Sequence, residues 1–379
     1  MISVADGSTD MESGENIRST IFAVGGGKGG VGKTVITASL GVGLSMLDKR
    51  VVVVDVDLGG ADLHSVIGIE KPDRTYHHFL RREYQRLDDV LLEHPSFPSM
   101  KILCGAMGSL GDANLPNFQK QKFIRHLEKL DADFIILDLG AGTSYNVLDF
   151  FLTADQGIVV VNPDLLSILE SYNFLKLVVF RKIAQIIRGH EGALELIQRV
   201  VQAETHKESS TVDDLVRGVM QMDADLGSKI EYFLEAFHPM ILINMMEEAK
   251  EKEKVLSIQA AARELLSVQT IYIGAIRRDK IVRKSLDKMV PFIRYDTKAN
   301  ASKDLTHIIS TEILHNGRLQ SFRTRHTIRK KGKEDLKAES EEVMCSVRCP
   351  YWEECEFKNG GYPCDLHHLT QISGARGEK

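Results

Sequence analysis

Residues 23–40 read AVGGGKGGVGKTVITASL, and this stretch decides how the chain folds. Six of the eight residues from Gly25 to Gly32 are glycine. They lie between an apolar run, residues 21–24, and a helix-like run that begins at Thr34. Glycine loses more backbone freedom on folding than any other residue. So dense a run therefore indicates a loop in which bare backbone has a function.

The segment from Gly27 to Thr34 matches the phosphate-binding pattern G-x-x-x-x-G-K-[ST], between an expected strand and an expected helix. Without Cβ atoms, successive N–H groups can converge on phosphates, and the next helix directs its positive end at the same place. We expect Lys33 to bridge the β- and γ-phosphates and the Thr34 hydroxyl to ligate Mg²⁺. The residues expected to bind the nucleotide are Gly27, Lys28, Gly29, Gly30, Val31, Gly32, Lys33 and Thr34.

Composition narrows the class of protein. The chain has 379 residues, of which 43% are hydrophobic and 27% charged, as in ordinary soluble domains. Its formal net charge of −5 gives no strong signal for nucleic acid or anionic membrane. Residues 1–20 do not resemble a signal peptide, and no apolar run is long enough to span a bilayer. We therefore expect a cytoplasmic protein.

Short β-branched runs alternate with amphipathic stretches over residues 19–316, which predicts an α/β fold with a mostly parallel, doubly wound sheet and helices on both faces. The expected strands are Ile21–Val24, Val51–Val56, Lys101–Cys104, Phe134–Leu139, Gln156–Val161, Met240–Asn244 and Thr270–Gly274.

Other segments depart from this alternation. Residues 181–239 have helical spacing and predict a helical insertion, in which Thr211 and Asp214 form a capping box. This insertion is either a lid or interaction surface, or simply long helices flanking the sheet. Beyond the core, we expect a disordered leader (1–18), a charged linker (317–342) and a small Cys-rich appendage (343–379).

Three carboxylates follow or end expected strands. Asp55 and Asp57 lie at the carboxyl end of the strand that begins at Val51, and Asp138 lies at the end of FIILD. Open α/β sheets bind ligands at this edge. An acid ending a strand after a phosphate-binding loop fits a Mg²⁺-binding role for Asp138. Asp55 either contributes to the nucleotide site or only caps the loop that follows it.

The second lysine in GKGGVGKT, Lys28, resembles the deviant Walker A loop of the MinD/ParA family of switch ATPases. The resemblance implies a P-loop NTPase that forms an ATP-dependent homodimer, in which Lys28 reaches the nucleotide of the partner chain. It also implies slow, partner-stimulated hydrolysis of ATP. The expected catalytic residues are Lys28, Lys33 and Asp57.

The resemblance extends to other site residues. It implies that Asp57 lies near Mg²⁺ and the attacking water, that Asp138 holds Mg²⁺ directly or through water, and that the N–H of Gly142 contacts the γ-phosphate. Asn244, at a strand end, is expected to read the adenine edge. The chain departs from the family pattern where Leu139 and Gly140 replace a hydroxyl residue and a proline.

The resemblance covers about Ile21 to Leu314, interrupted by the helical insertion. Within the family, the chain is most similar to the MinD-like regulators of flagellar number and placement. The activating glutamine-leucine-arginine helix of those regulators is missing from residues 1–20. Residues 314–333 are basic but poor in apolar side chains, so we do not expect peripheral membrane association.

Four cysteines near the end of the chain have the spacing C-x3-C-x5-C-x8-C. In a reducing compartment they suggest one metal centre, Zn²⁺ or a [4Fe–4S] cluster, in a segment too small for a core of its own. Disulfides and unligated thiols are the alternatives. A fifth cysteine, Cys104, is expected in the core. The expected metal ligands are Cys345, Cys349, Cys355 and Cys364.

Three functions compete. The first is an ATP-dependent switch that positions or regulates a cellular structure, such as the flagellum or the cell pole, through an unidentified protein partner. The second is an ATP-dependent iron–sulfur cluster carrier, because a related branch of the superfamily assembles such clusters. The third is a DNA-partitioning ATPase, suggested only by the basic stretch at residues 318–333. The absence of a C-x-x-C pair in the ATPase region favours the switch.

Overall fold

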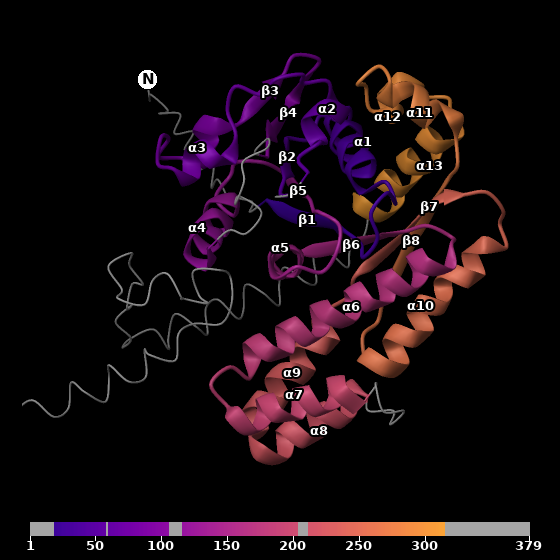
Figure 1. Ribbon diagram of the computed structural model, residues 1–379. Coiled ribbons are helices and arrows are strands. Elements are labelled where there is room, and N and C mark those ends of the chain that lie inside the picture. Colours follow the sequence, from indigo (N-terminus) through magenta and orange to yellow (C-terminus); the bar gives the residue numbers. More distant parts are fainter. Residues whose placement is uncertain (1–18, 58–59, 106–115, 204–210, 315–379) are drawn as a thin grey trace, which may run out of the picture.

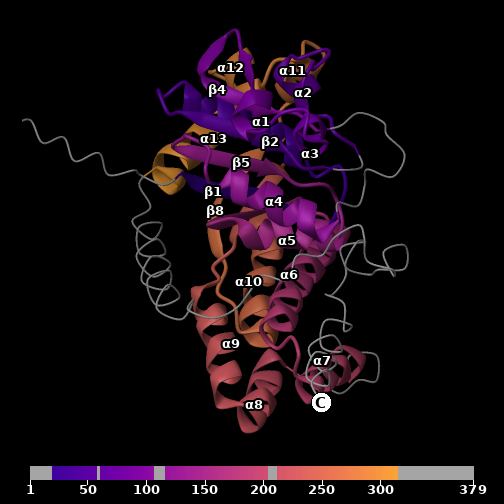
Figure 2. The same ribbon diagram turned by 90° about the vertical axis from the view of Figure 1, so that its left-hand side faces the viewer.

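A computed structural model describes residues 19–57, 60–105, 116–203 and 211–314 (Figure 1). The leader, the charged linker and the Cys-rich segment predicted from the sequence lie outside these residues. The described part is built around one sheet, and its helices cover both faces of that sheet (Figures 1 and 2).

The sheet has eight strands in the order β3-β4-β2-β5-β1-β6-β7-β8. Neighbouring strands are parallel, except that β3 and β4 form an antiparallel pair at one edge. The strands are β1 (Thr20–Gly25), β2 (Val51–Asp55), β3 (Leu92–His94), β4 (Phe97–Leu103), β5 (Phe134–Asp138), β6 (Gln156–Val161), β7 (Met240–Met246) and β8 (Ile271–Arg277).

The α/β fold and all seven strands expected from the sequence are confirmed, β6 with the expected ends and the other six with shifted ends. β4, β7 and β8 run further than expected, and the sequence prediction missed β3. β3 has only three residues and no apolar run, so its pairing with β4 depends on the tertiary fold rather than on a local pattern.

Alternate residues of each central strand point to opposite faces, and both faces are apolar. In β1, Ile21 and Ala23 pack into one buried cluster, whereas Phe22 and Val24 pack into the other. The first cluster is covered by α3 (Tyr76–Leu80), the 3₁₀ turn η1 (Leu87–Val90), α4 (Asn117–Leu127), α5 (Tyr145–Thr153), α6 (Leu165–Ile186) and α10 (Glu251–Leu266). The second is covered by α1 (Lys33–Ser45), α2 (Leu63–Ile67), α11 (Lys280–Leu286), α12 (Phe292–Tyr295), α13 (Asn300–Ile308) and the π-helical turn η3 (Ile309–Ile313).

Three helices follow α6 and lie at the end of α6 and α10, away from the sheet (Figures 1 and 2). They are α7 (Glu191–Ala203), α8 (Val212–Met222) and α9 (Ala224–Ala236). The predicted capping box at the start of α8 is confirmed: Thr211 N–H donates to Asp214 at 2.9 Å, and Asp214 N–H donates to the Thr211 hydroxyl at 3.3 Å. The helical character expected for this region is therefore correct.

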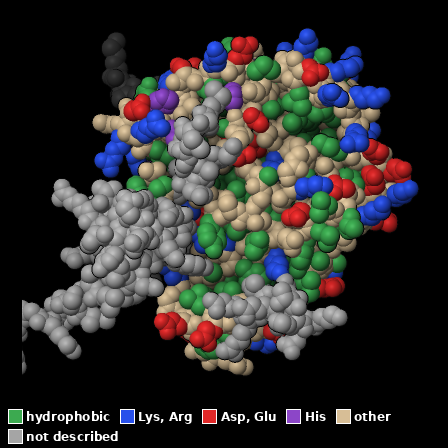
Figure 3. Space-filling model, in the orientation of Figure 1, with side chains coloured by type: hydrophobic (Ala, Val, Ile, Leu, Met, Phe, Trp, Pro, Cys, Tyr) green, Lys and Arg blue, Asp and Glu red, His purple; other side chains and the backbone are tan. Residues whose placement is uncertain are grey.

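The described surface mixes both signs of charge. Figure 3 shows Lys and Arg side chains (blue) beside Asp and Glu side chains (red) along the upper and right-hand edges of the face in view. Within the described ranges, no helix is both long enough and apolar enough to cross a membrane.

A buried ion network joins α4, α5 and α6. The ammonium of Lys120, which is fully buried, donates to Asp149 and, at 3.2 Å, to Asn146. Arg181 donates to both carboxylate oxygens of Asp149 at 2.8 and 2.9 Å, and Gln185 donates to Oδ1 at 2.9 Å. A single carboxylate thus compensates two buried cations and connects three helices.

Replacing this carboxylate should destabilise the protein more than removing an exposed ion pair. Because Asp149→Ala leaves two cations without their counter-charge, we expect it to lower the free energy of unfolding by about 3–5 kcal/mol. The matched control is Asp131→Ala, which removes the exposed partner of Arg50 and should have little effect. Urea unfolding monitored by circular dichroism measures both. Equal effects of the two variants would contradict a structural role for the network.

Candidate nucleotide-binding site

The glycine-rich loop connects the end of β1 to the start of α1 with left-handed backbone at two positions. Gly30 has φ +77°, and Gly32, which caps α1, has φ +93° and ψ +23°. Only glycine adopts these values without steric cost. The turn directs the N-terminus of α1, and its unpaired N–H groups, toward the inside of the loop.

The loop backbone also lies unusually close to its neighbours. A Cβ on Gly27 would be 2.0 Å from the carbonyl oxygen of Glu170 in α6, and one on Gly26 would be 2.9 Å from the carbonyl oxygen of Val160 in β6. These glycines are therefore required by packing against the rest of the protein, a requirement separate from phosphate binding.

Lys33 is buried at the start of α1 and faces acidic groups. The residue is only 7% exposed, and its ammonium donates to the carbonyl of Lys28 at 3.3 Å. Burial lowers the pKa of Lys33, while the charges of Asp138 and Asp57 oppose that shift. A cation held in this way is well suited to bind phosphate oxygens.

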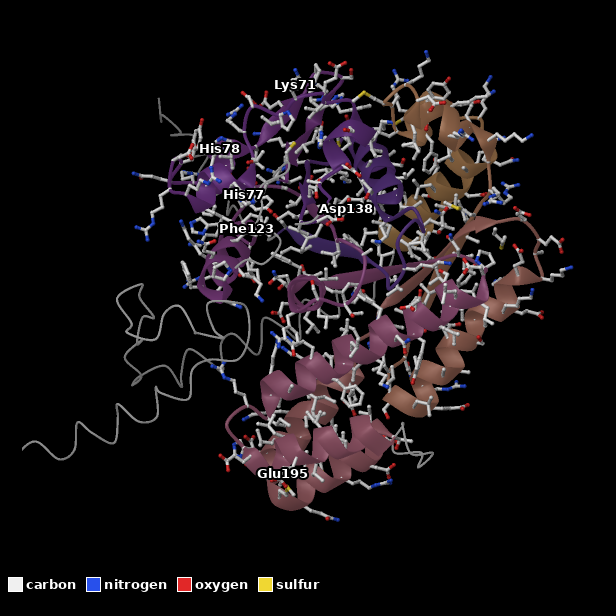
Figure 4. All side chains as sticks on the ribbon, in the orientation of Figure 1. Lys71, His77, His78, Phe123, Asp138 and Glu195 are labelled. Carbon is white, nitrogen blue, oxygen red and sulfur yellow. The ribbon has the colours of Figure 1, made fainter. Side chains whose placement is uncertain are left out.

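Asp138 ends β5 at the middle of the molecule (Figure 4) and is 1% exposed. Its carboxylate accepts hydrogen bonds from the hydroxyls of Thr34 and Thr37, the latter at 3.1 Å. Burial raises the pKa of Asp138 to about 7, although both threonines and Lys33 act in the opposite direction. A carboxylate beside the Thr34 hydroxyl is a donor set of the kind that Mg²⁺ prefers.

Asp55 and Asp57 differ in their surroundings. The buried carboxylate of Asp55 accepts from the N–H groups of Asp57 at 3.1 Å and Leu63 at 3.2 Å, so it caps the loop after β2. Burial and the charge of Asp138 raise its pKa well above the usual range. Asp57 accepts from Gly60 N–H at 3.1 Å and lies beside Gly140, where a Cβ would be 2.8 Å from its Oδ1.

Strand register brings these groups together. Val24 is paired with Asp138 between β1 and β5, and Asp55 is paired with Asp138 between β2 and β5. The loop that follows β1 therefore begins beside Asp138, which ends the neighbouring strand β5, and Asp55 ends β2, the next strand beyond β5. Gly140 stands where the resemblance would place proline, and its missing side chain leaves room for Asp57.

Lys28 forms an ion pair within the chain. Its ammonium is 2.7 Å from Asp164 Oδ1, and the side chains are 32% and 47% exposed. The hydrogen bond from Lys28 lowers the pKa of Asp164, whose carboxylate also accepts from Ser167 N–H at the start of α6. Because exposed ion pairs contribute little to stability, Lys28 can leave Asp164 at low cost.

The remaining predicted nucleotide ligands lie on opposite sides of the loop. Asn244 in β7 donates from Nδ2 to the Val31 carbonyl at 2.8 Å, so it contacts the loop directly. Gly142 has φ +92°, and a Cβ built there would contact nothing within 4 Å, which leaves its surroundings open.

The predicted cysteine ligands Cys345, Cys349, Cys355 and Cys364 lie outside the described residues. Cys104 is buried, as expected, and burial raises its pKa to about 12. Over the described ranges, no three His, Cys, Asp or Glu side chains are grouped to hold a metal ion.

Two features were not predicted from the sequence. Thr37 bonds to Asp138, which its position one helical turn after Lys33 could have indicated. The pairing of Lys28 with Asp164 joins residues 136 positions apart, and no local pattern could have shown it.

Packing of the loop can be tested with two alanine substitutions. We expect Gly27→Ala to destabilise the protein by about 1–3 kcal/mol, because its Cβ would overlap the Glu170 carbonyl. Gly29→Ala is the matched control: its Cβ would lie 3.8 Å from that of Ala141, an ordinary contact. Urea unfolding without nucleotide measures both, and a Gly29→Ala effect as large as that of Gly27→Ala would disprove the packing argument.

The raised pKa of Asp138 predicts a pH-dependent stability. Its pKa is 3.8 ordinarily and about 7 in the folded protein, so folding favours the protonated form. This contribution is present at low pH and is lost as pH rises toward about 7. In Mg²⁺-free buffer, Asp138→Asn should therefore become more stable relative to the unsubstituted protein between about pH 5 and about pH 8. A stability difference independent of pH would contradict this.

Part of the chain is similar in sequence to a protein family and to characterised proteins. A family profile described as "ParA: NUBPL iron-transfer P-loop NTPase" matches residues 16–189. The antiactivator FleN of Pseudomonas aeruginosa is 32% identical over 159 residues, which cover 41% of this chain and 55% of FleN. The septum site-determining protein MinD of Buchnera aphidicola is 30% identical over 160 residues, covering 42% of this chain and 58% of that protein. The chain thus spans a little more than half the length of these relatives.

The fold of the chain is also similar to that of a solved MinD structure. MinD from Pyrococcus horikoshii, solved in complex with Mg-ADP, is similar with a TM-score of 0.54 and 19% sequence identity. The match covers 79% of this chain and 98% of that one. At this identity the likeness establishes the fold alone, and it agrees with the profile and with the relatives. Residues 16–189 thus resemble the ParA family, and the described part of the chain has the fold of a MinD-like P-loop NTPase.

Proposed function

We propose that this protein is an ATP-binding and slowly hydrolysing molecular switch that dimerises with ATP and positions or regulates a cellular structure, such as the flagellum or the cell pole. One observation carries the proposal: the buried Lys33 lies at the start of α1 and faces Asp138 and Asp57 across a glycine loop. A triphosphate with its Mg²⁺ complements both the cation and the acids.

Each group has a role in this proposal. Lys33 would bind the β- and γ-phosphates, and Thr34 with Asp138 would hold Mg²⁺ directly or through water. The ion supplies charge neutralisation on the phosphates when it is bound. Asp57 would position the attacking water, and the N–H of Gly142 would contact the γ-phosphate and lose that contact after hydrolysis.

The relatives support a switch that acts on a cellular structure. FleN is named an antiactivator, and MinD a septum site-determining protein. The MinD structure with Mg-ADP supports the same nucleotide and ion for this chain. The slow hydrolysis of ATP, the protein partner and the cellular structure that is positioned are all part of what we propose.

The Lys28–Asp164 pair supports dimerisation with ATP. In the single chain, Asp164 compensates the charge of Lys28. A nucleotide bound to a second chain offers Lys28 a more highly charged partner, since a triphosphate carries several negative charges. The weak ion pair would then break when the dimer forms, and Lys28 would contribute its charge in trans.

A second candidate is an ATP-dependent iron–sulfur carrier, because the matching family profile is described as an iron-transfer NTPase. This function needs exposed thiolates, whereas Cys104 is buried and its pKa is raised to about 12. The carrier would therefore depend on Cys345, Cys349, Cys355 and Cys364, which would bind Zn²⁺ or a [4Fe–4S] cluster.

ATP-dependent dimerisation can be tested with variants that remove the charge of Lys28 or of Asp164. In ATP and Mg²⁺, sedimentation should show a dimer for the unsubstituted protein and a monomer for Lys28→Ala, while ADP should give monomers throughout. Asp164→Asn keeps a capping residue but removes the charge that competes for Lys28, so it should dimerise at equal or lower ATP concentration. Lys298→Ala, far along the chain, is the matched lysine control.

The outcomes separate the two candidates when the protein is purified anaerobically. A dimer that depends on ATP and on Lys28, with metal content unaffected by nucleotide, supports the switch. Dimerisation of Lys28→Ala would refute the role of this lysine. A cluster that bridges two chains and is released on hydrolysis would replace the switch with the carrier.

A further inference from the structure

The edge of the sheet at β8 is bordered by a groove. β8 pairs with β7, and the structure describes no strand on its other side. β6 and β7 separate β8 from β1 and its glycine loop, so this edge lies apart from the candidate nucleotide site. The groove has a volume of about 450 Å³ and is lined by β8 on one side and by α13 with its π-helical turn η3 on the other.

The groove includes the backbone edge of β8 rather than a single face of the sheet. Tyr272 and Ala275 line it and pack on the cluster that α10 covers, whereas Ile273 and Ile308 line it and belong to the cluster that α13 covers. Figure 1 shows α10 and α13 on either side of β8. The N–H and C=O groups along the free side of an edge strand are a template for another extended chain.

The carboxyl end of this edge is already closed by a side chain. The N–H of Arg277 donates to Asp304 of α13 at 3.0 Å, where the carbonyl of an added strand would otherwise accept. The guanidinium of Arg277 holds the same carboxylate at 2.7 and 2.9 Å. Because backbone groups of alternate residues in a strand face the same side, the N–H of Ala275 also points out of the sheet. The open part of the edge therefore lies before Arg277.

The open part of the edge is short and bent. Ile241 of β7 pairs with Tyr272, but Leu242 pairs with Gly274, so β8 has one extra residue here. Such a bulge limits how far a second strand can follow an edge. Gly274 has φ +138°, and Ile308 lies 2.6 Å from where its Cβ would be, so α13 holds the bend in place. This edge therefore suits a short peptide better than the β8 strand of a second copy.

Lysines lie on both walls of the groove. On the α13 wall, Lys303 and His307 are exposed and one helical turn apart. On the α10 wall, the ammonium of Lys252 is 4.4 Å from the centre of the ring of the lining tyrosine. Of the carboxylates that line the groove, Asp304 is already paired, and Glu312 lies at the end formed by η3. Acidic side chains on an extended peptide complement these walls.

We propose that the groove at β8 binds a short, extended peptide with acidic side chains, supplied by a partner protein. The peptide adds a strand to the sheet, so that its backbone pairs with β8 before Arg277. Its acidic side chains lie against Lys303 and Lys252, and this charge match favours acidic peptides over basic ones.

The chain's own continuation after Leu314 is a poorer occupant. α1 connects β1 to β2 across the face that α13 also covers, and β2 lies on the β3 side of β1. A parallel strand reached through α13 would lie in the opposite direction, beyond β8, and its crossover would have the opposite hand. Nearly all crossovers between parallel strands have one hand, the right, so strand addition from a separate chain is favoured.

The test selects peptides from a random phage-displayed library on the full-length protein, without nucleotide. We expect the selected peptides to alternate acidic and β-branched residues, and fluorescence anisotropy measures their affinities. Ala275→Pro should weaken binding by roughly 10-fold, because it removes an N–H from the edge. Proline is tolerated on edge strands, and circular dichroism checks the fold of this variant. Ala275→Ser keeps the N–H and is the matched control, with unchanged affinity.

Charge reversal gives a second test. Lys303→Glu should weaken the selected peptides by roughly 10-fold at low salt and reduce the salt dependence of binding. Lys298→Glu is the matched control, since Lys298 is exposed and lies outside the groove, and it should have little effect. Lys303→Glu alters an exposed side chain, so it tests the proposal even where the proline variant fails to fold.

The outcomes are distinct. The proposal is overturned if no peptide is selected, or if the peptides bind equally well to Lys303→Glu. Full binding to a folded Ala275→Pro variant would overturn strand addition. Occupancy by the chain's own acidic segment would appear as tighter peptide binding when Glu339, Glu341 and Glu342 are changed to lysine in the full chain, and that result would overturn the role of a partner.

Discussion

The organisation of this protein depends on one buried electrostatic arrangement, the ammonium of Lys33 opposite the carboxylates of Asp138 and Asp57. Burial disfavours the charged form on both sides: the pKa of Lys33 is lowered, and that of Asp138 is raised to about 7. The charge of Lys33 offsets part of this cost for Asp138, and both carboxylates offset part of it for Lys33, whereas the charge of Asp57 raises the pKa of Asp138 further.

The glycine loop can hold this arrangement only because its backbone fits into the surrounding structure. The carbonyls of Val160 and Glu170 lie where the side chains of Gly26 and Gly27 would be. The loop is thus braced by β6 and α6, and α6 continues to the α7–α9 helices (Figure 1). The Asp149 network ties α6 to α5, which begins just after Gly142. Close packing and hydrogen bonds to α6 therefore connect the loops at the candidate site to the outlying helices.

The places where the chain departs from the MinD/ParA pattern have physical reasons. Gly140 replaces the usual proline and leaves space for the Asp57 carboxylate. Arg277, at the end of β8, donates from its backbone and its guanidinium to Asp304 at 2.7–3.0 Å.

The sequence alone determined the alternating strands, the glycine loop and the acids at strand ends, because these depend on local periodicity and on spacing within a few residues. It also indicated the helical region between Tyr172 and Met240. Only the tertiary structure decided that Lys28 pairs with Asp164, that Asn244 supports the loop, and that Met245 adopts left-handed backbone beside Asn162. These contacts join distant segments, so they arise from strand order and register, which no local pattern of residues specifies.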